Sequence, residues 1–453
     1  MTGDFSFGGV RAVVVGAGVA GASAARVLLN LGAEVLVTDE REATELNGTV
    51  AELLAAGADV HTGGHDPHDL DGATLVIVSP GVRLDAAVPS WARERGLPVW
   101  GELEFGARIA ATPYLAVTGT NGKTTTTGMI ASCLTAAGLD ALACGNIGHP
   151  FPAAAVERHD VLVVEASSFQ LSTHASFHPV VSVLLNVAED HVDWHGSADA
   201  YRLAKAKIFA AQSAPDTHVG NREDPQAAEI SAAAPCAVVW IRAGEPAEGE
   251  VGYVDGQLTA RLDGEAVSLG PVDPRRAGYR EDAAAAAAAS LSFGVTPAAV
   301  AQGLAAFEPQ AHRGDVVAES DGVRFVDNSK ATNVHAALAA IAAVDGPLVL
   351  IAGGRAKGQD LAPLGRAAKR LDAVIAIGEA APEIVELLRG RTEVRTAESM
   401  GEATRAAFDR CPRPGTVLLA PACASWDMYR DYHERGEDFA AGARAIVAER
   451  GRG

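Results

Sequence analysis

The 453-residue chain has few cysteines, and their spacing matches neither a redox motif nor a zinc site. Its five cysteines form no CxxC pair. Isolated thiols of this kind predict reduced side chains in a reducing compartment rather than a disulfide framework. The sequence therefore argues against a disulfide-stabilised or zinc-dependent fold.

The sequence also lacks an excess of positive charge, an export signal and a membrane span. With 37 Lys and Arg against 57 Asp and Glu, the formal charge of −20 argues against a nucleic-acid-binding protein, which needs a basic face. Residues 1–10 have neither the basic start nor the apolar core of a signal peptide. The alanine run at 283–289 is too short to span a membrane and follows charged residues. We expect a cytoplasmic protein without nucleic-acid or membrane partners, in which single Lys and Arg residues meet any anionic ligand.

The chain does contain a regular alternation of predicted strands and helices. Its length predicts two to four domains, and 48% hydrophobic with 21% charged residues is typical of globular proteins. The alternation predicts parallel sheets, so we expect an α/β fold of three domains at 1–110, 111–309 and 310–453, the third starting its sheet near Phe325. The predicted strands include 11–15, 34–38, 74–78, 160–165, 180–185, 348–352, 373–377 and 416–420, and the predicted helices include 22–31 and 282–291.

A glycine loop that can bind a nucleotide triphosphate follows one of these strands, with the sequence G-T-N-G-K-T. Gly119 and Gly122 allow backbone N–H groups to turn toward phosphate oxygens at a helix N-terminus. Lys123 can reach the β- and γ-phosphates, and the hydroxyl of Thr124 can hold Mg²⁺. The usual P-loop needs glycine where Val117 stands, so this shortened loop indicates a particular branch of ATP-using enzymes.

A second glycine loop, G-A-G-V-A-G at 16–21, follows the first strand, and Asp39 ends the second strand. This pattern is the dinucleotide fingerprint, so a nicotinamide-dependent oxidoreductase is a rival interpretation. Since an ATP loop follows in the same chain, we favour another diphosphate, such as a UDP-sugar. The turn S-P-G-V at 79–82 lies at the same predicted sheet edge.

Polar residues follow the strands of the central domain. Glu165 ends an apolar strand, where it can ligate Mg²⁺ or simply begin a helix. Asp190 and His191 follow the next strand and could ligate a second metal or orient a substrate. Lys205 and Lys207 lie on one predicted helix, where two lysines usually indicate a solvated face.

Four motifs together resemble the Mur ligases: G-T-N-G-K-T at 119–124, E-x-S-S-F-Q-L at 165–171, N-V-x-x-D-H-x-D at 186–193 and D-N-S-K-A-T-N at 327–333. The similarity extends through P-A-C-A-S-x-D at 421–427 and R-G-x-x-F at 435–439, so it covers nearly the whole chain. The S-K-A-T-N and P-A-C-A-S segments are most similar to the members that add D-glutamate. The resemblance implies an ATP-dependent ligase that joins D-glutamate to UDP-N-acetylmuramoyl-L-alanine through an acyl phosphate, in peptidoglycan precursor synthesis.

The resemblance also implies an N-terminal Rossmann-like sheet for the UDP-sugar, a central P-loop-type ATPase domain and a closing C-terminal Rossmann-like domain. It implies a monomer that uses ATP, two Mg²⁺ ions and CO₂ bound as a carbamate on Lys205. His312 and Arg313 resemble a hinge pair whose arginine reaches ATP.

By the same resemblance, individual residues receive roles. ATP would contact Gly119, Thr120, Asn121, Gly122, Lys123, Thr124, Thr125, Arg313 and Asp327. The UDP-sugar substrate would contact Gly16, Gly18, Gly21, Asp39, Arg41, Ser79, Gly81, Asn146 and His191. Glutamate would contact Lys330, Thr332, Lys357, Ser425 and Tyr432. The metal ions would be held by Thr124, Glu165, His191 and carbamylated Lys205. The catalytic residues would be Lys123, Glu165, His191 and Lys205.

One segment departs from the family pattern. Where the family has His-Asn-x-x-Asn-Ala, this chain has G-Y-R-E-D-A at 278–283. Tyr279 either stacks on adenine in place of the asparagine contact, or that contact is absent. A sister ligase with another amino acid or with folate as substrate, an L-glutamate-adding variant and a non-catalytic nucleotide-binding regulator also remain open.

Overall fold

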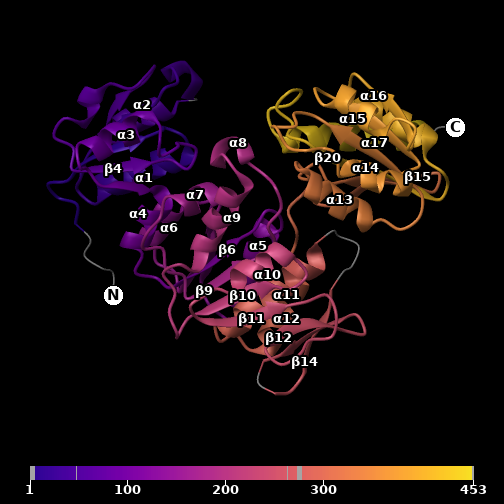
Figure 1. Cartoon of the computed structure of the whole chain (residues 1–453), viewed down its shortest axis with the longest axis horizontal. Coiled ribbons are helices and arrows are strands. Elements are labelled where there is room, and N and C mark those ends of the chain that lie inside the picture. Colours follow the sequence, from indigo (N-terminus) through magenta and orange to yellow (C-terminus); the bar gives the residue numbers. More distant parts are fainter. Residues whose placement is uncertain (1–5, 47, 263, 273–277, 451–453) are drawn as a thin grey trace. The chain divides into compact units, whose positions relative to one another are not determined.

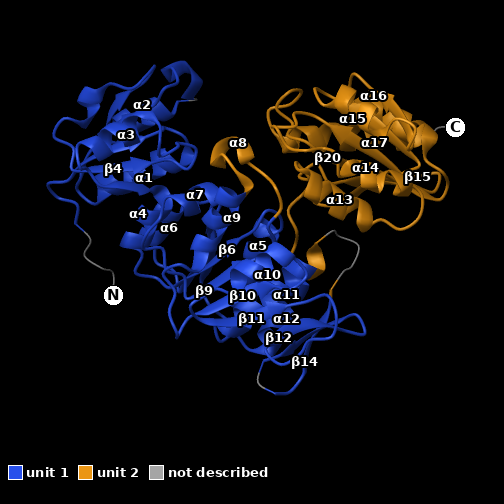
Figure 2. Ribbon diagram, viewed as in Figure 1, with its two compact units in different colours: residues 1–187, 199–271, 281–307 blue, residues 188–198, 272–280, 308–453 orange. Residues whose placement is uncertain are grey.

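The computed structural model describes residues 6–46, 48–262, 264–272 and 278–450. Three β-sheets with flanking helices follow one another along the chain, which confirms the predicted three-domain α/β class (Figure 1). The chain packs into two compact units (Figure 2). Unit 1 comprises residues 1–187, 199–271 and 281–307, and unit 2 comprises 188–198, 272–280 and 308–453. The domain boundaries near 110 and 310 remain predictions.

The N-terminal sheet is parallel, with the strand order β3-β2-β1-β4-β5. Its central strand is apolar and buried, as expected for a strand covered on both faces. The strands are β1 (Arg11–Val15), β2 (Glu34–Thr38), β3 (Asp59–His61), β4 (Leu75–Val78) and β5 (Val99–Gly101). The helices are α1 (Val19–Asn30), α2 (Thr49–Ala55), α3 (Ala87–Glu94) and α4 (Glu102–Ile109), with 3₁₀ turns η1 (Ala43–Leu46) and η2 (Pro67–Leu70).

The central sheet has the order β14-β13-β12-β11-β10-β9-β6-β8-β7. It is parallel from β7 to β12, and β13 and β14 add an antiparallel extension that the sequence analysis missed. Its strands are β6 (Tyr114–Thr118), β7 (Ala141–Gly145), β8 (Val161–Glu165), β9 (Val181–Leu184), β10 (Thr217–Asn221), β11 (Ala237–Ile241), β12 (Glu250–Val254), β13 (Gln257–Arg261) and β14 (Val267–Pro271). The helices are α5 (Lys123–Ala136), α6 (Phe151–Val156), α7 (Ser168–Ser172), α8 (Val192–His195), α9 (Ala198–Ala206), η3 (Lys207–Phe209), α10 (Pro225–Ser231), α11 (Tyr279–Ser292) and α12 (Pro297–Ala306).

The C-terminal sheet has the order β15-β16-β20-β17-β18-β19. It is parallel except for the antiparallel pair β15–β16. The strands are β15 (Asp315–Ser320), β16 (Val323–Asp327), β17 (Leu348–Gly353), β18 (Ala373–Ile377), β19 (Glu393–Thr396) and β20 (Gly415–Ala422). The helices are α13 (Val334–Ala342), α14 (Leu364–Ala367), η4 (Ala368–Arg370), α15 (Ala381–Leu388), α16 (Met400–Arg410) and α17 (Tyr432–Arg450).

The prediction that the third sheet starts near Phe325 is wrong. The sheet begins earlier in the sequence, with β15 at Asp315. Every residue of β15 is at least partly exposed, so this edge strand lacks the apolar run that reveals the buried strands. Across the described parts of the chain, no helix combines the length and apolar character that a membrane crossing requires.

Candidate active site

The phosphate loop between β6 and α5 has the backbone that its glycines predict. Gly119 and Gly122 have φ angles of 159° and 85°. A Cβ atom at Gly122 would lie 2.1 Å from Oδ1 of Asp282 on α11, so the loop also has no room for a side chain there. Lys123 begins α5 directly after the loop, with Thr124 and the buried Thr125 in the first turn. The N-terminus of α5 therefore lies at the loop, as anion binding requires.

Two lysines converge on one carbonyl oxygen of this loop. Nζ of Lys123 donates to the carbonyls of Gly119 at 2.8 Å and of Thr120 at 2.9 Å. Nζ of Lys205 donates to the same Gly119 carbonyl at 2.7 Å and lies 4.6 Å from the centroid of the Tyr201 ring. Lys205 is only 1% exposed, so the solvated face expected from the helix pattern is wrong for this residue. Lys207 is half-buried and donates instead to the carbonyl of Ser172 at 2.8 Å.

Neighbouring side chains hold the loop in place. The backbone N–H of Thr120 donates to the Asn186 carbonyl at 2.9 Å, and that of Asn121 donates to Oδ1 of Asn186 at 2.8 Å. The hydroxyls of Thr120 and Tyr201 are 2.9 Å apart. Tyr201 was not singled out from the sequence, because nothing in its helix distinguishes it from a core tyrosine.

Glu165, at the end of β8, offers a buried carboxylate oxygen. Its Oε1 accepts a hydrogen bond from Nδ2 of Asn146 at 2.8 Å, which brings together two residues predicted from the sequence. Its Oε2 is buried and accepts none from the described residues. Since buried polar atoms are normally paired, this oxygen fits a cation ligand. The described residues contain no preformed cluster of three or more His, Cys, Asp or Glu side chains, so a Mg²⁺ ion here would need phosphate and water oxygens as well.

The first glycine loop packs tightly against the turn after β4. Gly16 has a φ of 97°, and its carbonyl accepts a hydrogen bond from Oγ of Ser79 at 3.1 Å. A Cβ atom at Gly21 would lie 1.9 Å from this same carbonyl oxygen, so only glycine lets α1 pack here. Gly18 is the N-cap of α1 and has no side-chain cap, and a Cβ atom at Gly18 or Gly81 would meet nothing within 4 Å. This helix N-terminus is suited to a diphosphate.

Asp39 is committed to its own loop. Its buried carboxylate accepts hydrogen bonds from the N–H of Ala17 at 2.7 Å and from the N–H, Nε and Nη2 of Arg41 at 3.0, 2.9 and 2.7 Å. Burial alone would raise the pKa of Asp39, but these bonds and the Arg41 charge lower it to about 2. A carboxylate has about four lone-pair sites, and all are used. This arrangement argues against the nicotinamide alternative, in which the same carboxylate must accept from ribose hydroxyls.

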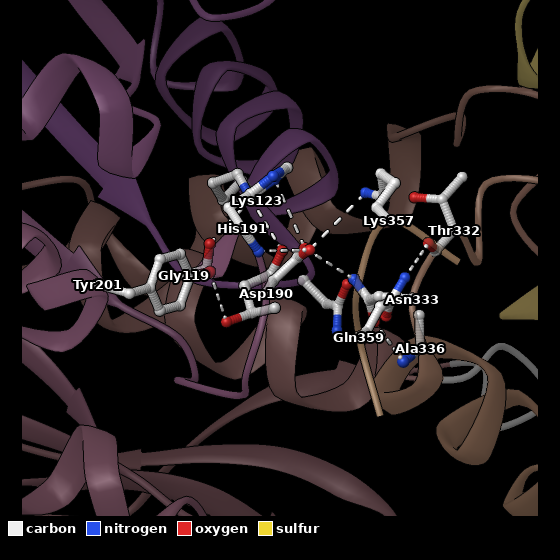
Figure 3. A network of polar contacts seen from close by, with 12 residues as sticks. Gly119, Lys123, Asp190, His191, Tyr201, Thr332, Asn333, Ala336, Lys357 and Gln359 are labelled. Carbon is white, nitrogen blue, oxygen red and sulfur yellow. Dashed lines mark hydrogen bonds and ion pairs between the residues drawn. The ribbon is translucent and has the colours of Figure 1, made fainter. Parts of the chain in front are cut away.

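In unit 2, Lys357, which was predicted to bind glutamate, lies near the buried carboxylate of Asp190. Nζ of Lys357 lies 3.7 Å from Oδ1 of Asp190, and Nδ2 of Asn333 lies 3.4 Å from Oδ2 of Asp190 (Figure 3). Nε2 of His191 lies 3.6 Å from the same carboxylate. Lys357 and His191 both have positive φ angles, 55° and 54°, which are uncommon for residues other than glycine. Gln359, which the sequence analysis missed, donates to the carbonyl of Thr332 at 3.4 Å.

The other predicted residues of unit 2 lie on the adjoining loops. Nζ of Lys330 is 4.1 Å from the centroid of the Tyr432 ring, and Ser425 is buried after β20. Asp327 is 1% exposed and accepts from Nδ1 of His312 at 2.6 Å and from the N–H of Ser329 at 2.9 Å. Burial raises the pKa of Asp327, and its hydrogen bonds only partly oppose this rise.

Arg313 precedes β15, and its backbone N–H donates to Asp315 at 3.3 Å. Asp282, in the departing segment, accepts from the hydroxyl of Thr126 at 3.2 Å. It stands where the family pattern has its second asparagine, which is the signal that could have identified it. Arg435, a buried arginine on α17, gave no sequence signal beyond the R-G-x-x-F motif.

Comparison with known proteins decides the family. The chain is 43% identical to the UDP-N-acetylmuramoylalanine–D-glutamate ligase of Frankia casuarinae over 456 residues, which cover 98% of this chain and 96% of the relative. It belongs to the Mur ligase family. The ligase of the same name from Pelotomaculum thermopropionicum is 39% identical, with 95% of this chain and 96% of the relative covered. Three family models match this Mur ligase: "Mur ligase MurD-like, N-terminal domain" at 10–101, "Mur ligase middle domain" at 117–268 and "Mur ligase, glutamate ligase domain" at 312–423.

Solved structures show the same fold. MurF ligase from Thermotoga maritima in complex with ADP matches with a TM-score of 0.61 and 17% identity, covering 92% of this chain and 96% of that one. UDP-N-acetylmuramate-alanine ligase MurC from the same organism matches with a TM-score of 0.57 and 19% identity, covering 96% and 99%. At these identities the similarity concerns the fold of this Mur ligase.

Proposed function

We propose that this Mur ligase joins D-glutamate to UDP-N-acetylmuramoyl-L-alanine in cytoplasmic peptidoglycan precursor synthesis, with ATP converted to ADP and phosphate. Relatives named for this reaction align over nearly the whole chain. The observation that carries the proposal is the phosphate loop, where Lys123 and Lys205 meet at the Gly119 carbonyl. Residues 1–110 would bind the UDP-sugar, 111–309 would bind ATP, and 310–453 would bind glutamate, in a monomer.

The reaction proceeds in two steps. A carboxylate oxygen of the UDP-sugar substrate attacks the γ-phosphorus of ATP, the bond to the β,γ-bridging oxygen breaks, and ADP leaves. The neutral amine of glutamate then attacks the acyl carbon, the bond to the phosphate oxygen breaks, and the amine proton passes to a base. Lys123, at the phosphate loop, would neutralise the charge that develops during phosphoryl transfer, which is where most of the catalysis of this step lies.

The residues around the loop also fit the metal ions. The unpaired Oε2 of Glu165 and the hydroxyl of Thr124 would hold Mg²⁺, which supplies charge neutralisation when bound. Lys205 places a buried amine at the same loop, where its Nζ donates to the Gly119 carbonyl. A neutral amine can add to CO₂ and release a proton, which gives the carbamate that would serve as a ligand for a second Mg²⁺. His191 would complete this site or hold the substrate.

The nucleotide-binding site would be completed by Arg313 and by Tyr279, at the start of α11. Asp327 would act on the nucleotide through His312 rather than directly, since its carboxylate is already bonded within unit 2. Lys330, Thr332 and Lys357 would orient the carboxylates of glutamate. This positioning places the amine for attack on the acyl phosphate.

The test of this proposal is mass identification of the product. The purified chain is incubated with UDP-N-acetylmuramoyl-L-alanine, ATP, Mg²⁺ and either D- or L-glutamate. The proposal requires ADP together with a product heavier by one glutamyl residue, formed with the D-enantiomer. A product formed only with L-glutamate or with another amino acid would instead identify a sister ligase.

A further inference from the structure

Arg435, in the first turn of α17, is a buried cation without an acidic partner. Its side chain is 1% exposed and forms no ion pair within the described part of the chain. Its Nε donates to Oγ of Ser329 at 3.0 Å, its Nη2 to the carbonyl of Ser329 at 2.8 Å, and its Nη1 to the carbonyl of Cys423 at 3.0 Å. Burial lowers the pKa of Arg435 to about 10, so the guanidinium stays charged at neutral pH. A buried charge held only by neutral acceptors is costly, and this cost calls for a functional reason.

The two segments that Arg435 joins carry residues that are predicted to bind glutamate. Ser329 directly precedes Lys330, and Cys423 lies two residues before Ser425. The hydroxyl of Ser329 also donates to the carbonyl of Tyr432 at 2.8 Å. One guanidinium therefore fixes both loops against the start of α17.

The glycine turn after β17, which leads to Lys357, packs on the same group. A Cβ atom at Gly354 would lie 2.2 Å from the Ala424 carbonyl and 3.2 Å from Nη1 of Arg435. The backbone N–H of Arg355 donates to that Ala424 carbonyl at 2.9 Å. The three loops of the glutamate site thus share Arg435 as a common support.

The positive charge of Arg435 is a second reason to assign it a role in glutamate binding. Glutamate brings two carboxylates to a chain with a formal charge of −20, so its site needs local positive potential. Lys357 already faces the carboxylate of Asp190, whereas the Arg435 charge is opposed by no ion-pair partner in the described structure. The planar fork of arginine, with five donors in fixed directions, is also better suited to hold two segments at once than the ammonium group of lysine.

We propose that Arg435 is a positioning residue for the acceptor amino acid: it fixes the 329–333 and 422–425 loops and supplies positive potential to the substrate's carboxylates. This inference rests on the proposed function. Arg435 acts through Lys330, Ser425 and Tyr432 rather than by touching the reacting atoms.

The test compares Arg435→Lys, which keeps the charge, and Arg435→Met, which removes it, with Arg389→Met as the matched control. Arg389 lies in the same unit with its side chain 71% exposed. Phosphate release is measured against glutamate, ATP and UDP-substrate concentration. We expect the KM for glutamate to rise by at least about tenfold in Arg435→Lys and further in Arg435→Met, with the KM for ATP changed by less than about twofold.

A direct measurement of glutamate binding separates the proposed role of Arg435 from the proposed ligase activity. Calorimetric titration of D-glutamate into protein with bound ADP and UDP-substrate should show weaker binding in both Arg435 variants and unchanged binding in Arg389→Met. If a variant fails to fold, as judged by its thermal melting curve, Arg435→Ala assayed with added guanidinium ion replaces it, and rescue of glutamate binding is expected. Unchanged glutamate binding and KM in a folded variant would overturn the role of Arg435. Absence of ADP formation by the unsubstituted enzyme would instead reject the proposed ligase activity.

Discussion

Glu102 is a buried carboxyl group whose protonation should affect stability near neutral pH. It begins α4, is 2% exposed, and accepts a hydrogen bond from Nε2 of Gln170 at 2.9 Å. Burial raises the pKa of Glu102 from 4.5 to about 7, although the Gln170 bond opposes this rise. The folded state therefore holds the proton more tightly than the unfolded state. The stability that this group contributes is complete below pH 4.5 and is lost as pH rises through 7.

Replacing Glu102 with glutamine should remove this dependence. We expect Glu102→Gln to be more stable than the unsubstituted chain at pH 8, by up to about 3 kcal/mol in the free energy of unfolding, and by much less at pH 5. Urea unfolding at both pH values measures the difference. A difference that is the same at pH 5 and pH 8 would contradict the assigned pKa.

Lys205 allows a second test at the scale of one residue, with Lys207 as its control on the adjoining 3₁₀ turn. Lys205→Ala should lower turnover by at least about 100-fold, because it removes the proposed carbamate ligand at the phosphate loop. Short carboxylic acids added to this variant should restore part of the activity by supplying the missing carboxylate. Lys207→Ala should retain turnover, since the Lys207 ammonium group donates to the Ser172 carbonyl and not to the phosphate loop. Full activity of Lys205→Ala would end the assignment.

The sequence identified most of these residues through motifs, but it could not show which of them are buried or already bonded. Lys205 and Lys207 are two positions apart, and only packing places one of them at the Gly119 carbonyl. Asp39 was correctly placed at the end of β2, yet its four hydrogen bonds depend on a loop that a pattern does not describe. The R-G-x-x-F motif includes Arg435 but could not reveal its role, because its partners are mainly backbone carbonyls from distant segments.

At the scale of elements, several strands with continuous apolar runs were predicted well, although β11 was missed despite such a run. β1, β2 and β18 begin and end where the pattern placed them, whereas α1 begins three residues earlier than predicted. The antiparallel strands β13, β14 and β15 were missed because polar or glycine residues interrupt their apolar runs. β14 and β15, which lie at the edges of their sheets, also lack the buried apolar run on which the prediction depends.

The loop between β1 and α1 gives a prediction at this scale. Asp39→Asn should raise the KM for the UDP-sugar substrate by at least about tenfold, since an amide cannot accept all four hydrogen bonds that come from the Ala17 backbone and from the backbone and side chain of Arg41. The KM for ATP should stay unchanged, because the phosphate loop is a separate element. Asp85→Asn is the control, as that carboxylate is 68% exposed and pairs with Arg83. Equal KM values in both variants would show that Asp39 does not hold the loop for this ligand.

At the scale of the whole molecule, the alternation of strands and helices predicted three sheets, but it did not predict how packing groups them. The N-terminal and central sheets lie in one compact unit because they share a hydrophobic core. Phe105 of α4 and Phe151 of α6 are fully buried in that core, and the ring centroid of Phe151 lies 5.2 Å from that of Tyr114. Such packing arises between segments far apart in sequence and leaves no periodic signal.

The central claim is that the γ-phosphate of ATP is transferred to a sugar-linked carboxylate at the 119–124 loop. Its most direct test is the dependence of ADP formation on each reactant, with Lys123→Ala beside the unsubstituted enzyme. We predict repeated turnover to ADP only when the UDP-substrate and D-glutamate are both present, at most one ADP per enzyme molecule when glutamate is left out, and a loss of at least about 100-fold in Lys123→Ala. No ADP from the complete mixture, or equal ADP formation by Lys123→Ala, would contradict the account.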